Sequence, residues 1–328
     1  MRYRSLGNSG IEASVVGLGA WAMGGWMWGG TDEAAAVKAI HTAIDIGMNL
    51  IDTAPIYGFG VSETIVGKAI RGKRDKVVLA TKCGMVWHVK QGVFFFNDED
   101  EKQDVYKYLA PQSIRYEVEQ SLKRLGTDYI DLYQTHWQDA TTPIQETMET
   151  LLQLKQEGKI RAIGVSNVTL DQIEEYRKYG VVDTDQEKYS MLDREIEASL
   201  LPWCERHSVA MLAYSPLGQG LLTGKIGPER RFEPGDQRLD NPRFSLDNRQ
   251  KIQQLFQAFQ PIATAHRLTL GQLVIAWTLA QPGLSHVLCG ARNPDQVLEN
   301  AGGGDLALPE AEITEMNRAL QQYQSALL

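Results

Sequence analysis

IRAIGVSNVTLDQIEEYRKYGVVDTDQ, residues 160–186, contains the structural unit that is repeated along the chain. Two short runs rich in β-branched and aliphatic residues, 160–166 and 181–186, flank residues 170–179, where apolar residues recur with helical spacing. A strand, a helix and a second strand in this order form a right-handed βαβ unit with parallel strands. The segment therefore predicts a parallel sheet that is covered by helices.

The same alternation extends in both directions from this segment. Further strand-like runs are VVGLG (15–19), NLID (49–52), KVVLAT (76–81), YIDLYQT (129–135), VAMLAYS (209–215) and HVLCG (286–290). Further helices are expected at 32–46, 62–71, 112–125, 144–157, 195–207 and 269–280. Eight strands that alternate with helices fit an α/β fold, a closed (β/α)8 TIM barrel, and we expect one domain over residues 1–328.

Three segments lie outside this alternation. Residues 3–17 contain Gly7-Asn8-Ser9-Gly10 between two short apolar runs, which predicts an N-terminal β-hairpin that caps the barrel floor. Residues 84–110 and 216–247 are long connections after strands, so we expect long loops at the C-terminal face, where barrel active sites lie. The acidic part of the first connection, 97–104, also fits plain solvated decoration.

Composition excludes several classes of protein. The net charge of −8 is spread along the chain, which disfavours binding to duplex nucleic acid but allows a local anion site. The amino terminus has no apolar core of signal-peptide length, and no run of 18 apolar residues occurs, so neither secretion nor membrane insertion is expected. Three widely spaced cysteines predict neither disulfides nor a zinc site and favour the reducing cytoplasm.

Four polar residues are expected at one mouth of the barrel. Asp52, Lys82 and His136 each end or follow a predicted strand, and Tyr57 comes five residues after Asp52. Taken singly, each has a structural explanation, as a turn cap, a snorkelling lysine, a surface tyrosine or a satisfied core histidine. Because all four converge on one end of the barrel, we interpret them together as a proton-transfer unit.

The proposed chemistry depends on the tyrosine. A phenol with a pKa near 10 is a poor acid at neutral pH, and an adjacent Lys82 ammonium would lower that pKa. Asp52 would hold Lys82 protonated and in place, while His136 would orient a substrate carbonyl or share the proton. A metal site is the weaker alternative, since the set lacks the group of several His and Cys ligands expected for zinc, and a metal would have to compete with Lys82 for Asp52.

Five segments, in order over nearly the whole chain, closely resemble the aldo-keto reductase superfamily. They are LIDTAPIYGFGVSE (50–63), ATK (80–82), RLGTDYIDLYQTHW (124–137), GKIRAIGVSN (158–167) and AYSPLGQGLLTGK (213–225). The resemblance implies a barrel that binds NADP(H) and reversibly reduces aldehydes or ketones, with Asp52, Tyr57, Lys82 and His136 as catalytic tetrad and Tyr57 as proton donor. Within the superfamily, the chain looks like the bacterial branch of general stress proteins and inositol-linked reductases.

The resemblance also implies where the cofactor lies. No G-x-G-x-x-G follows the first strand, so a Rossmann site is disfavoured. Ser166, Asn167 and Gln186 would hold the nicotinamide carboxamide, and Tyr214 would stack on its ring. Backbone N–H groups of the turn after Tyr214 would line the pyrophosphate, unless this segment is a plain Gly/Pro turn; the residues concerned are Ser215, Leu217, Gly218 and Gly220.

CGARNPDQVLEN (289–300) resembles the family segment that binds the adenosine end. Its candidate residues are Gly290, Arg292, Gln296, Glu299 and Asn300. Many relatives have an arginine at the position of Gln296, and we expect Arg292 to take over contact with the 2′-phosphate, which favours NADP over NAD. Asn293 and Pro294 predict the capped start of a helix.

Aromatic residues gather near the predicted mouth and are candidate substrate contacts: Trp21, Trp26, Trp28, Trp87, His88 and Trp137. Such a lining would exclude water and favour aromatic or aliphatic aldehydes over heavily charged substrates, although Trp26 and Trp28 also fit as rim packing. Cys83 fits strand filler better than a reactive thiol.

Two other functions remain as alternatives. The first is a cofactor-binding regulatory subunit of the potassium-channel β type, which the same superfamily contains, with little turnover. The second is a Schiff-base aldolase with Lys82 as nucleophile, which Asp52 argues against because a carboxylate keeps the lysine charged. The small-molecule partner expected for the leading reading is a carbonyl substrate, and the sequence has no signal for an oligomeric state.

Overall fold

Eight parallel strands close into a barrel in this computed structural model, which describes residues 1–324. The barrel order is β3-β4-β5-β9-β10-β11-β12-β13, and β13 pairs with β3 to close it. Their bounds are β3 Val16–Gly19, β4 Leu50–Asp52, β5 Val78–Cys83, β9 Ile130–Thr135, β10 Ile160–Ser166, β11 Thr184–Lys188, β12 Ala210–Tyr214 and β13 Leu284–Gly290. All eight strands expected from the sequence are confirmed, as is the closed barrel.

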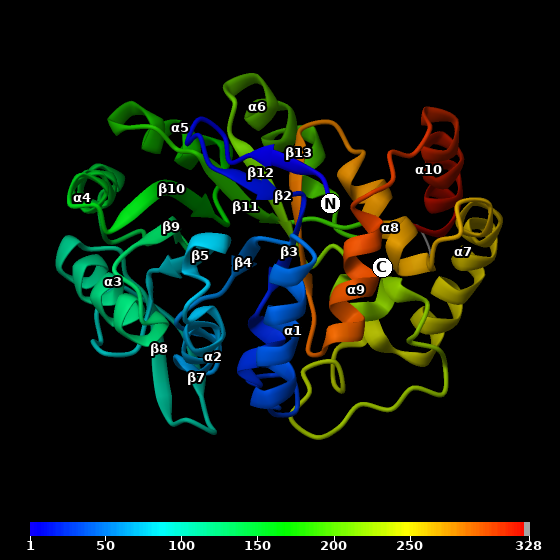
Figure 1. Cartoon of the computed structure of the whole chain (residues 1–328), viewed down its shortest axis with the longest axis horizontal. Coiled ribbons are helices and arrows are strands. Elements are labelled where there is room, and N and C mark those ends of the chain that lie inside the picture. The colour runs from blue at the N-terminus through cyan, green and yellow to red at the C-terminus, as the bar shows by residue number, and fades with distance from the viewer. Residues whose placement is uncertain (325–328) are drawn as a thin grey trace.

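Helices pack around the outside of the barrel (Figure 1). Those expected from the sequence are α1 Glu33–Asp45, α2 Val61–Ile70, α3 Pro111–Leu125, α4 Ile144–Gln156, α5 Leu170–Tyr179, α6 Leu200–His207, α8 Leu270–Leu279 and α9 Pro294–Gly303. The expected helix at 195–207 is divided, because a short 3-10 turn, η3 Glu195–Ala198, precedes α6. Two helices were missed: α7 Leu246–Ala265 and α10 Glu310–Gln324.

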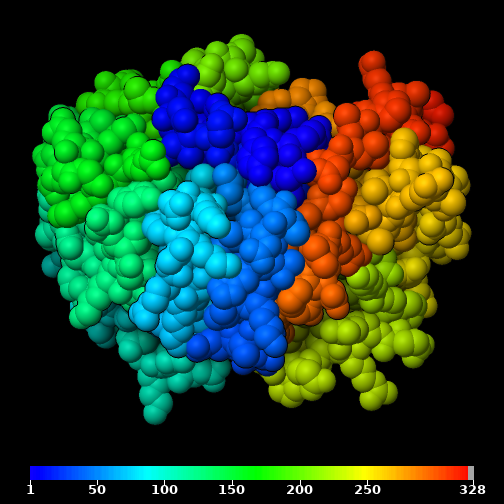
Figure 2. Space-filling view, in the orientation of Figure 1, coloured from blue at the N-terminus to red at the C-terminus, as the bar shows by residue number. Residues whose placement is uncertain are grey.

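The N-terminal hairpin closes one end of the barrel. Strands β1 (Tyr3–Ser5) and β2 (Glu12–Ser14) pair antiparallel, as expected. Leu6, Ile11 and Ala13 are buried against barrel-interior side chains such as Leu50 and Leu212. The hairpin, dark blue, lies at the top of Figure 1 and covers the surface there in Figure 2, whereas the excursions after β5 and β12 extend from the opposite end.

Residues 84–110 differ from the expected loop, because about half of them form a small antiparallel sheet. Its strands are β6 Met85–Val86, β7 Val93–Asp98 and β8 Gln103–Lys107, in the order β6-β8-β7. Residues 99–102, three of which are acidic, form the turn between β7 and β8. Phe94 is exposed, whereas Phe95 and Phe96 are half-buried and pack on Trp137 and Trp26, and this packing explains why the excursion orders as strands.

The connection at 216–247 contains two short 3-10 helices and no strand. They are η4 Gly218–Thr223 and η5 Pro242–Phe244. Two other 3-10 helices lie elsewhere in the chain: η1 Trp21–Gly24 follows β3, and η2 Arg74–Lys76 precedes β5. Within residues 1–324, no helix combines the length and the apolar character needed to cross a membrane. The prediction of one domain over 1–328 stays a prediction, and its last four residues lie outside the described part.

Candidate active site

The four expected catalytic residues lie together at the C-terminal ends of neighbouring strands. Asp52 is the last residue of β4, Lys82 lies in β5, and His136 directly follows β9. Tyr57 lies in the turn between β4 and α2. Because carboxyl ends of parallel strands meet at one rim of a barrel, the fold brings side chains 84 positions apart in sequence into one site.

Lys82 is the centre of this group. Its side chain is fully buried, and Nζ donates to both oxygens of Asp52, at 2.7 and 2.9 Å. Nζ also donates to the Thr53 carbonyl at 3.0 Å and lies 3.5 Å from the Tyr57 hydroxyl. The ammonium therefore bridges a carboxylate and a phenol, as the sequence predicts.

Asp52 is fixed by two amides in addition to Lys82. Gln186 Nε2 donates to Oδ2 at 2.9 Å, and Gln134 Nε2 lies 3.5 Å from the same oxygen. Gln186 was expected to hold the nicotinamide carboxamide, but here its amide contacts Asp52. Gln134 was missed, although its position in β9, two residues before His136, puts it on the same inner face.

His136 packs against the tyrosine ring. The two rings meet edge to face, with centroids 5.8 Å apart. The backbone of His136 is held on both sides, because its N–H donates to the Cys83 carbonyl at 2.8 Å and its carbonyl accepts from Asn167 Nδ2 at 2.8 Å. The imidazole is thereby held beside the Tyr57 ring.

The pKa of Tyr57 moves in the direction opposite to the sequence-based expectation. Burial, together with the negative charge of Asp52, raises the pKa of Tyr57 well above its usual value. Lys82 therefore does not make this phenol acidic at rest, since desolvation outweighs the cation. Burial and Lys82 lower the pKa of His136 well below its usual value, so at pH 7 the tyrosine is protonated and the histidine neutral.

The four residues expected at the nicotinamide form one hydrogen-bonded set. Asn167 donates to Ser166 Oγ at 3.1 Å and accepts from the Tyr214 hydroxyl at 2.8 Å. Ser166 Oγ donates to the Gln186 carbonyl at 2.6 Å. The set joins the ends of β10, β11 and β12 next to His136.

The turn after β12 has the backbone conformation of a tight binding loop. Ser215, Gly218 and Gly220 all have positive φ, at 55°, 53° and 95°. However, the N–H groups of Gly218 and Gly220 donate within the turn, to the carbonyls of Ser215 and Leu217 at 2.9 Å each. In this conformation the Gly220 N–H is therefore used within the turn, and its contact with a pyrophosphate stays a prediction.

The expected adenosine segment begins as predicted. Asn293 caps α9 by accepting from the Gln296 N–H at 3.0 Å, and Pro294 is the first residue of the helix. Gln296 Oε1 accepts from the Arg292 N–H at 2.8 Å, and Asn300 Nδ2 donates to the Gly290 carbonyl at 3.2 Å.

Arg292 connects this segment to the connection after η1. Its Nη1 donates to the Trp28 carbonyl at 3.1 Å, and its Nη2 donates to the Gly30 carbonyl at 2.6 Å. Glu299 pairs with Lys225, which ends the family-like segment 213–225 but carries no signal of its own in the sequence. Two cations, Arg292 and Lys225, thus lie at this end of the mouth.

Most of the expected substrate aromatics surround Tyr57 or the small sheet. Trp21 stacks on Tyr57, with ring centroids 6.0 Å apart, and meets Trp28 edge to face at 5.5 Å. Two others contact β7 of the small sheet: Trp26 stacks on Phe96 and donates to Asp98, and Trp137 packs on Phe95. Trp87, which follows β6, packs on Phe59 before α2.

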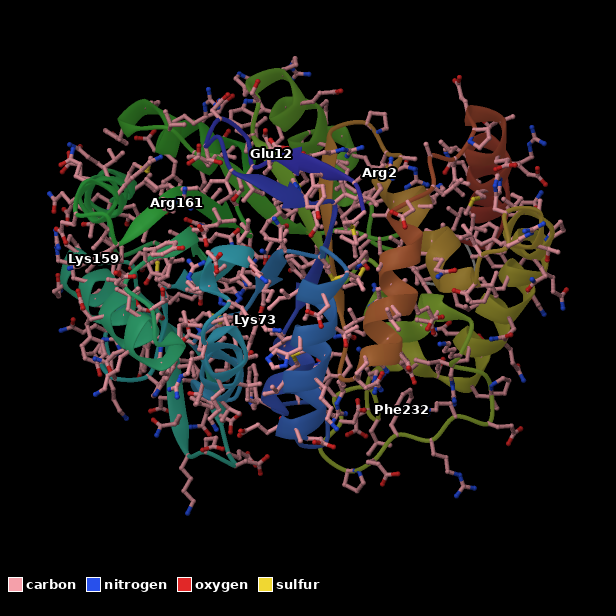
Figure 3. The ribbon with its side chains drawn as sticks, in the orientation of Figure 1. Arg2, Glu12, Lys73, Lys159, Arg161 and Phe232 are labelled. Carbon is pink, nitrogen blue, oxygen red and sulfur yellow. The ribbon has the colours of Figure 1, made fainter. Side chains whose placement is uncertain are left out.

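His88 does not share these contacts, because its ring lies 4.3 Å from that of the exposed Tyr116 on α3. Arg238, missed by the sequence analysis, lies over the rings of Trp28 and Phe232, at 4.8 and 4.7 Å from their centroids. Figure 3 labels Phe232 on the excursion after β12.

The mouth contains polar atoms that need a partner. Among the described residues, four buried side-chain atoms around it have no hydrogen-bond partner: Trp21 Nε1, Trp28 Nε1, Gln237 Nε2 and Glu299 Oε1. Buried polar atoms of this kind are costly unless a bound molecule or water satisfies them. Their spread from the tyrosine to α9 fits an elongated polar ligand such as a nicotinamide dinucleotide.

The chain is similar to known proteins over nearly its whole length. The family model described as Aldo/keto reductase family matches residues 15–321. The NADH-specific methylglyoxal reductase of Escherichia coli is 45% identical over 98% of this chain and 100% of its own length. Among solved structures, a glycerol dehydrogenase from Gluconobacter oxydans superposes with a TM-score of 0.85 at 39% identity, covering 96% of this chain and 93% of its own.

A second solved structure includes a cofactor. An aldo/keto reductase from Klebsiella pneumoniae, in complex with NADP and acetate, has a TM-score of 0.74 and 30% identity, covering 99% of this chain and 96% of its own.

Proposed function

The chain belongs to the aldo/keto reductase family and is an oxidoreductase that reduces carbonyl compounds with a nicotinamide cofactor; from this premise we propose that Tyr57 gives the proton to the carbonyl oxygen. The observation that carries the proposal is the position of Lys82 Nζ between the Asp52 carboxylate and the Tyr57 hydroxyl. The aldolase alternative has no comparable support, since Lys82 lies in a close ion pair with Asp52. The E. coli relative is named a reductase, which favours an enzyme over a regulatory subunit.

Each residue of the tetrad has a distinct task. Tyr57 is protonated at neutral pH, which is the state that a proton donor needs. As its proton leaves, the negative charge that develops on the phenol oxygen is stabilised by the Lys82 ammonium 3.5 Å away. Asp52 positions Lys82, and neutral His136 offers an N–H to the carbonyl oxygen. The bound nicotinamide supplies the hydride.

The cofactor is held along the later strands. Asn167 and Ser166 lie beside His136 and are suited to a carboxamide, which both donates and accepts hydrogen bonds. Tyr214 offers its ring at the same strand ends. The partnerless buried atoms Trp28 Nε1 and Glu299 Oε1 fit the remainder of the dinucleotide.

NADP(H) is our proposal for the preferred cofactor. Arg292, at the N-terminal end of α9, can form a bidentate contact with a 2′-phosphate, and the helix dipole favours the same charge. Lys225 adds a second cation at this end of the mouth. The E. coli relative is named NADH-specific, so the two cofactors must be compared directly.

Tyr57→Phe tests the catalytic proposal. Removing only the hydroxyl takes away the proton donor but keeps the ring that stacks on Trp21, so we expect kcat for methylglyoxal to fall by about 10²- to 10⁴-fold. The Kd for NADPH, measured by tryptophan fluorescence, should stay within a few-fold of wild type. Tyr3→Phe, which removes an exposed hydroxyl on the hairpin, is the control. Unchanged reduction by Tyr57→Phe would overturn the assignment.

Arg292→Met tests the cofactor proposal. We expect wild type to bind NADPH more tightly than NADH, and the variant to lose about tenfold or more in NADPH affinity because a charged hydrogen-bond partner is removed. The variant also removes the donor to the Trp28 and Gly30 carbonyls, which could disturb the mouth for either cofactor. NADH, which has no 2′-phosphate, is the internal control for that disturbance. Equal losses for both cofactors, or a wild type that prefers NADH, would contradict a 2′-phosphate contact.

We further propose a small, weakly charged aldehyde as substrate and the cytoplasm as location. Trp21 and Trp28 give the mouth an aromatic wall, and a relative with 45% identity is named a methylglyoxal reductase. All three cysteines are buried and unpaired, which fits a reducing compartment. Burial raises the pKa of Cys83 well above its usual value, which favours the strand-filler reading over a reactive thiol.

A further inference from the structure

Asn167 has a backbone conformation that must be held by its surroundings. It follows β10 with φ at +56°, in the left-handed region that side chains other than glycine rarely adopt. Its amide joins the His136 carbonyl and the Tyr214 hydroxyl, each at 2.8 Å. A shift of this turn would therefore move three strand ends at once.

A buried carboxylate behind the barrel wall holds this turn. Glu187 lies in β11 and is only 6% exposed, and its Oε1 accepts the Val168 N–H at 2.8 Å. The neighbouring Gln186 points inward to Asp52, so Glu187 points outward toward the helices. Glu187 therefore contacts the turn from outside, without reaching the mouth.

A second carboxyl group lies on the same outer face. Asp185 precedes Glu187 by two residues and is fully buried. Its Oδ2 accepts from Cys204 Sγ at 3.9 Å, while its Oδ1 has no donor among the described residues. An orphaned carboxyl oxygen in this position is explained if it carries a proton toward Glu187.

Electrostatics supports one proton for the two groups. Burial raises the pKa of both, that of Glu187 to about 7 and that of Asp185 well above its usual value, and the N–H groups of Val168 and Asn167 oppose the rise at Glu187. Facing groups are Cys204 on α6, whose pKa is raised, Arg177 on α5 and the Tyr214 hydroxyl on β12. Within residues 1–324, neither carboxyl group forms an ion pair.

We propose that Asp185 and Glu187 share a proton behind β11 and that this pair positions the Asn167 turn for the nicotinamide. Glu187 is a positioning residue, since it acts on the cofactor only through Asn167 and Val168. The inference rests on the proposed cofactor role of Asn167.

Three variants test the pair. Glu187→Leu removes the acceptor for the Val168 N–H, and we expect the Kd for NADPH to rise about tenfold while kcat at saturating cofactor changes less than about threefold. Glu187→Gln keeps an acceptor oxygen and should restore most of the affinity. Asp185→Asn replaces the shared proton with an amide N–H and should bind NADPH like wild type.

Cofactor binding measured over a pH series shows whether the charge of Glu187 positions the turn or whether its side chain only fills space. NADH is the probe, because it lacks a 2′-phosphate, a group that itself titrates near pH 6. Wild type should bind NADH more tightly at pH 8, where Glu187 is charged, than at pH 6. Glu187→Gln should be flat over this range, close to the wild-type value at pH 6. Parallel profiles for the two proteins would overturn the proposal.

Asn167→Ala distinguishes failure of the positioning role of Glu187 from failure of the cofactor role of Asn167. If Asn167→Ala leaves the NADPH Kd unchanged, the cofactor role of the turn fails, and the inference fails with it. If Asn167→Ala weakens binding but Glu187→Leu does not, the positioning role alone is overturned. Circular dichroism and Tm check the fold of each variant, and the Glu187→Gln pH series decides the question if Glu187→Leu does not fold.

Discussion

Tyr57 and Lys82 show how desolvation and charge compete over a few ångströms. The buried ammonium is 3.5 Å from the phenol, yet the carboxylate that holds the ammonium, together with burial, raises the pKa of Tyr57. The phenol therefore keeps its proton at rest, and Lys82 acts on the charge that forms when the proton leaves. The same competition governs the buried carboxyl groups that fix the turns around the mouth.

Glu117 illustrates this on α3, where it accepts the Gly84 N–H at 2.9 Å, two residues after Lys82. Burial raises the pKa of Glu117 to about 8. Because the folded state keeps a proton that the unfolded state loses above its ordinary pKa of 4.5, the stabilisation is complete below pH 4.5 and is lost as pH rises toward 8.

Glu117→Gln should remove this dependence, since the amide oxygen still accepts the Gly84 N–H and carries no titrating proton. We expect the variant to gain more than about 1 kcal/mol over wild type between pH 5 and pH 8. Urea unfolding at four pH values measures it. The exposed Glu119→Gln is the control, and a constant difference between Glu117→Gln and wild type would show that the carboxyl group does not titrate in this range.

At the scale of the helices, the residues that cap each helix are the clearest local signals of where it begins. Helices α5 and α8 each begin with a reciprocal capping box, Thr169 with Gln172 and Thr269 with Gln272. Such local signals explain why both helices are predictable. Helix α7 has a serine cap as well, but it lies after the long connection and contains Pro261, which weakens its sequence pattern.

Thr269→Ala should destabilise α8. The threonine hydroxyl accepts the Gln272 N–H at 3.2 Å, and losing such a cap costs about 1 kcal/mol of the free energy of unfolding. Urea denaturation followed by circular dichroism measures the loss. Thr264→Ala, at the exposed end of α7, should change stability by less than about 0.5 kcal/mol. An equal effect of the two substitutions would mean that the cap contributes nothing.

The two ends of the barrel have different roles: one end contributes to the stability of the fold, and the other carries the catalytic residues. The hairpin β1–β2 buries Leu6 in the barrel floor, while the tetrad lies at the opposite rim, which the C-terminal ends of the barrel strands form. Barrels commonly divide their tasks in this way, because strand ends and their loops face the substrate on one side only.

Leu6→Ala should therefore change stability and leave catalysis unaffected. The side chain is fully buried, so its truncation should cost about 2–5 kcal/mol. We expect kcat and KM for methylglyoxal to stay within about twofold of wild type at 25 °C, since no contact of Leu6 reaches the mouth. Leu298→Ala, at a half-exposed position on α9, is the control for stability. A large loss of kcat in folded Leu6→Ala would disprove the separation.

The sequence by itself determined the barrel, its hairpin and the residue types of the tetrad, because strand runs, helix caps and turn glycines are local signals that repeat along the chain. The branch of the family and the roles of the site residues stay predictions. Only the tertiary structure decided that 84–110 orders as a sheet, that Gln186 contacts Asp52, and that Tyr57 is less acidic than an isolated phenol. The reason is that burial and long-range contacts depend on which strand ends meet in space. Local sequence patterns do not determine which strand ends meet.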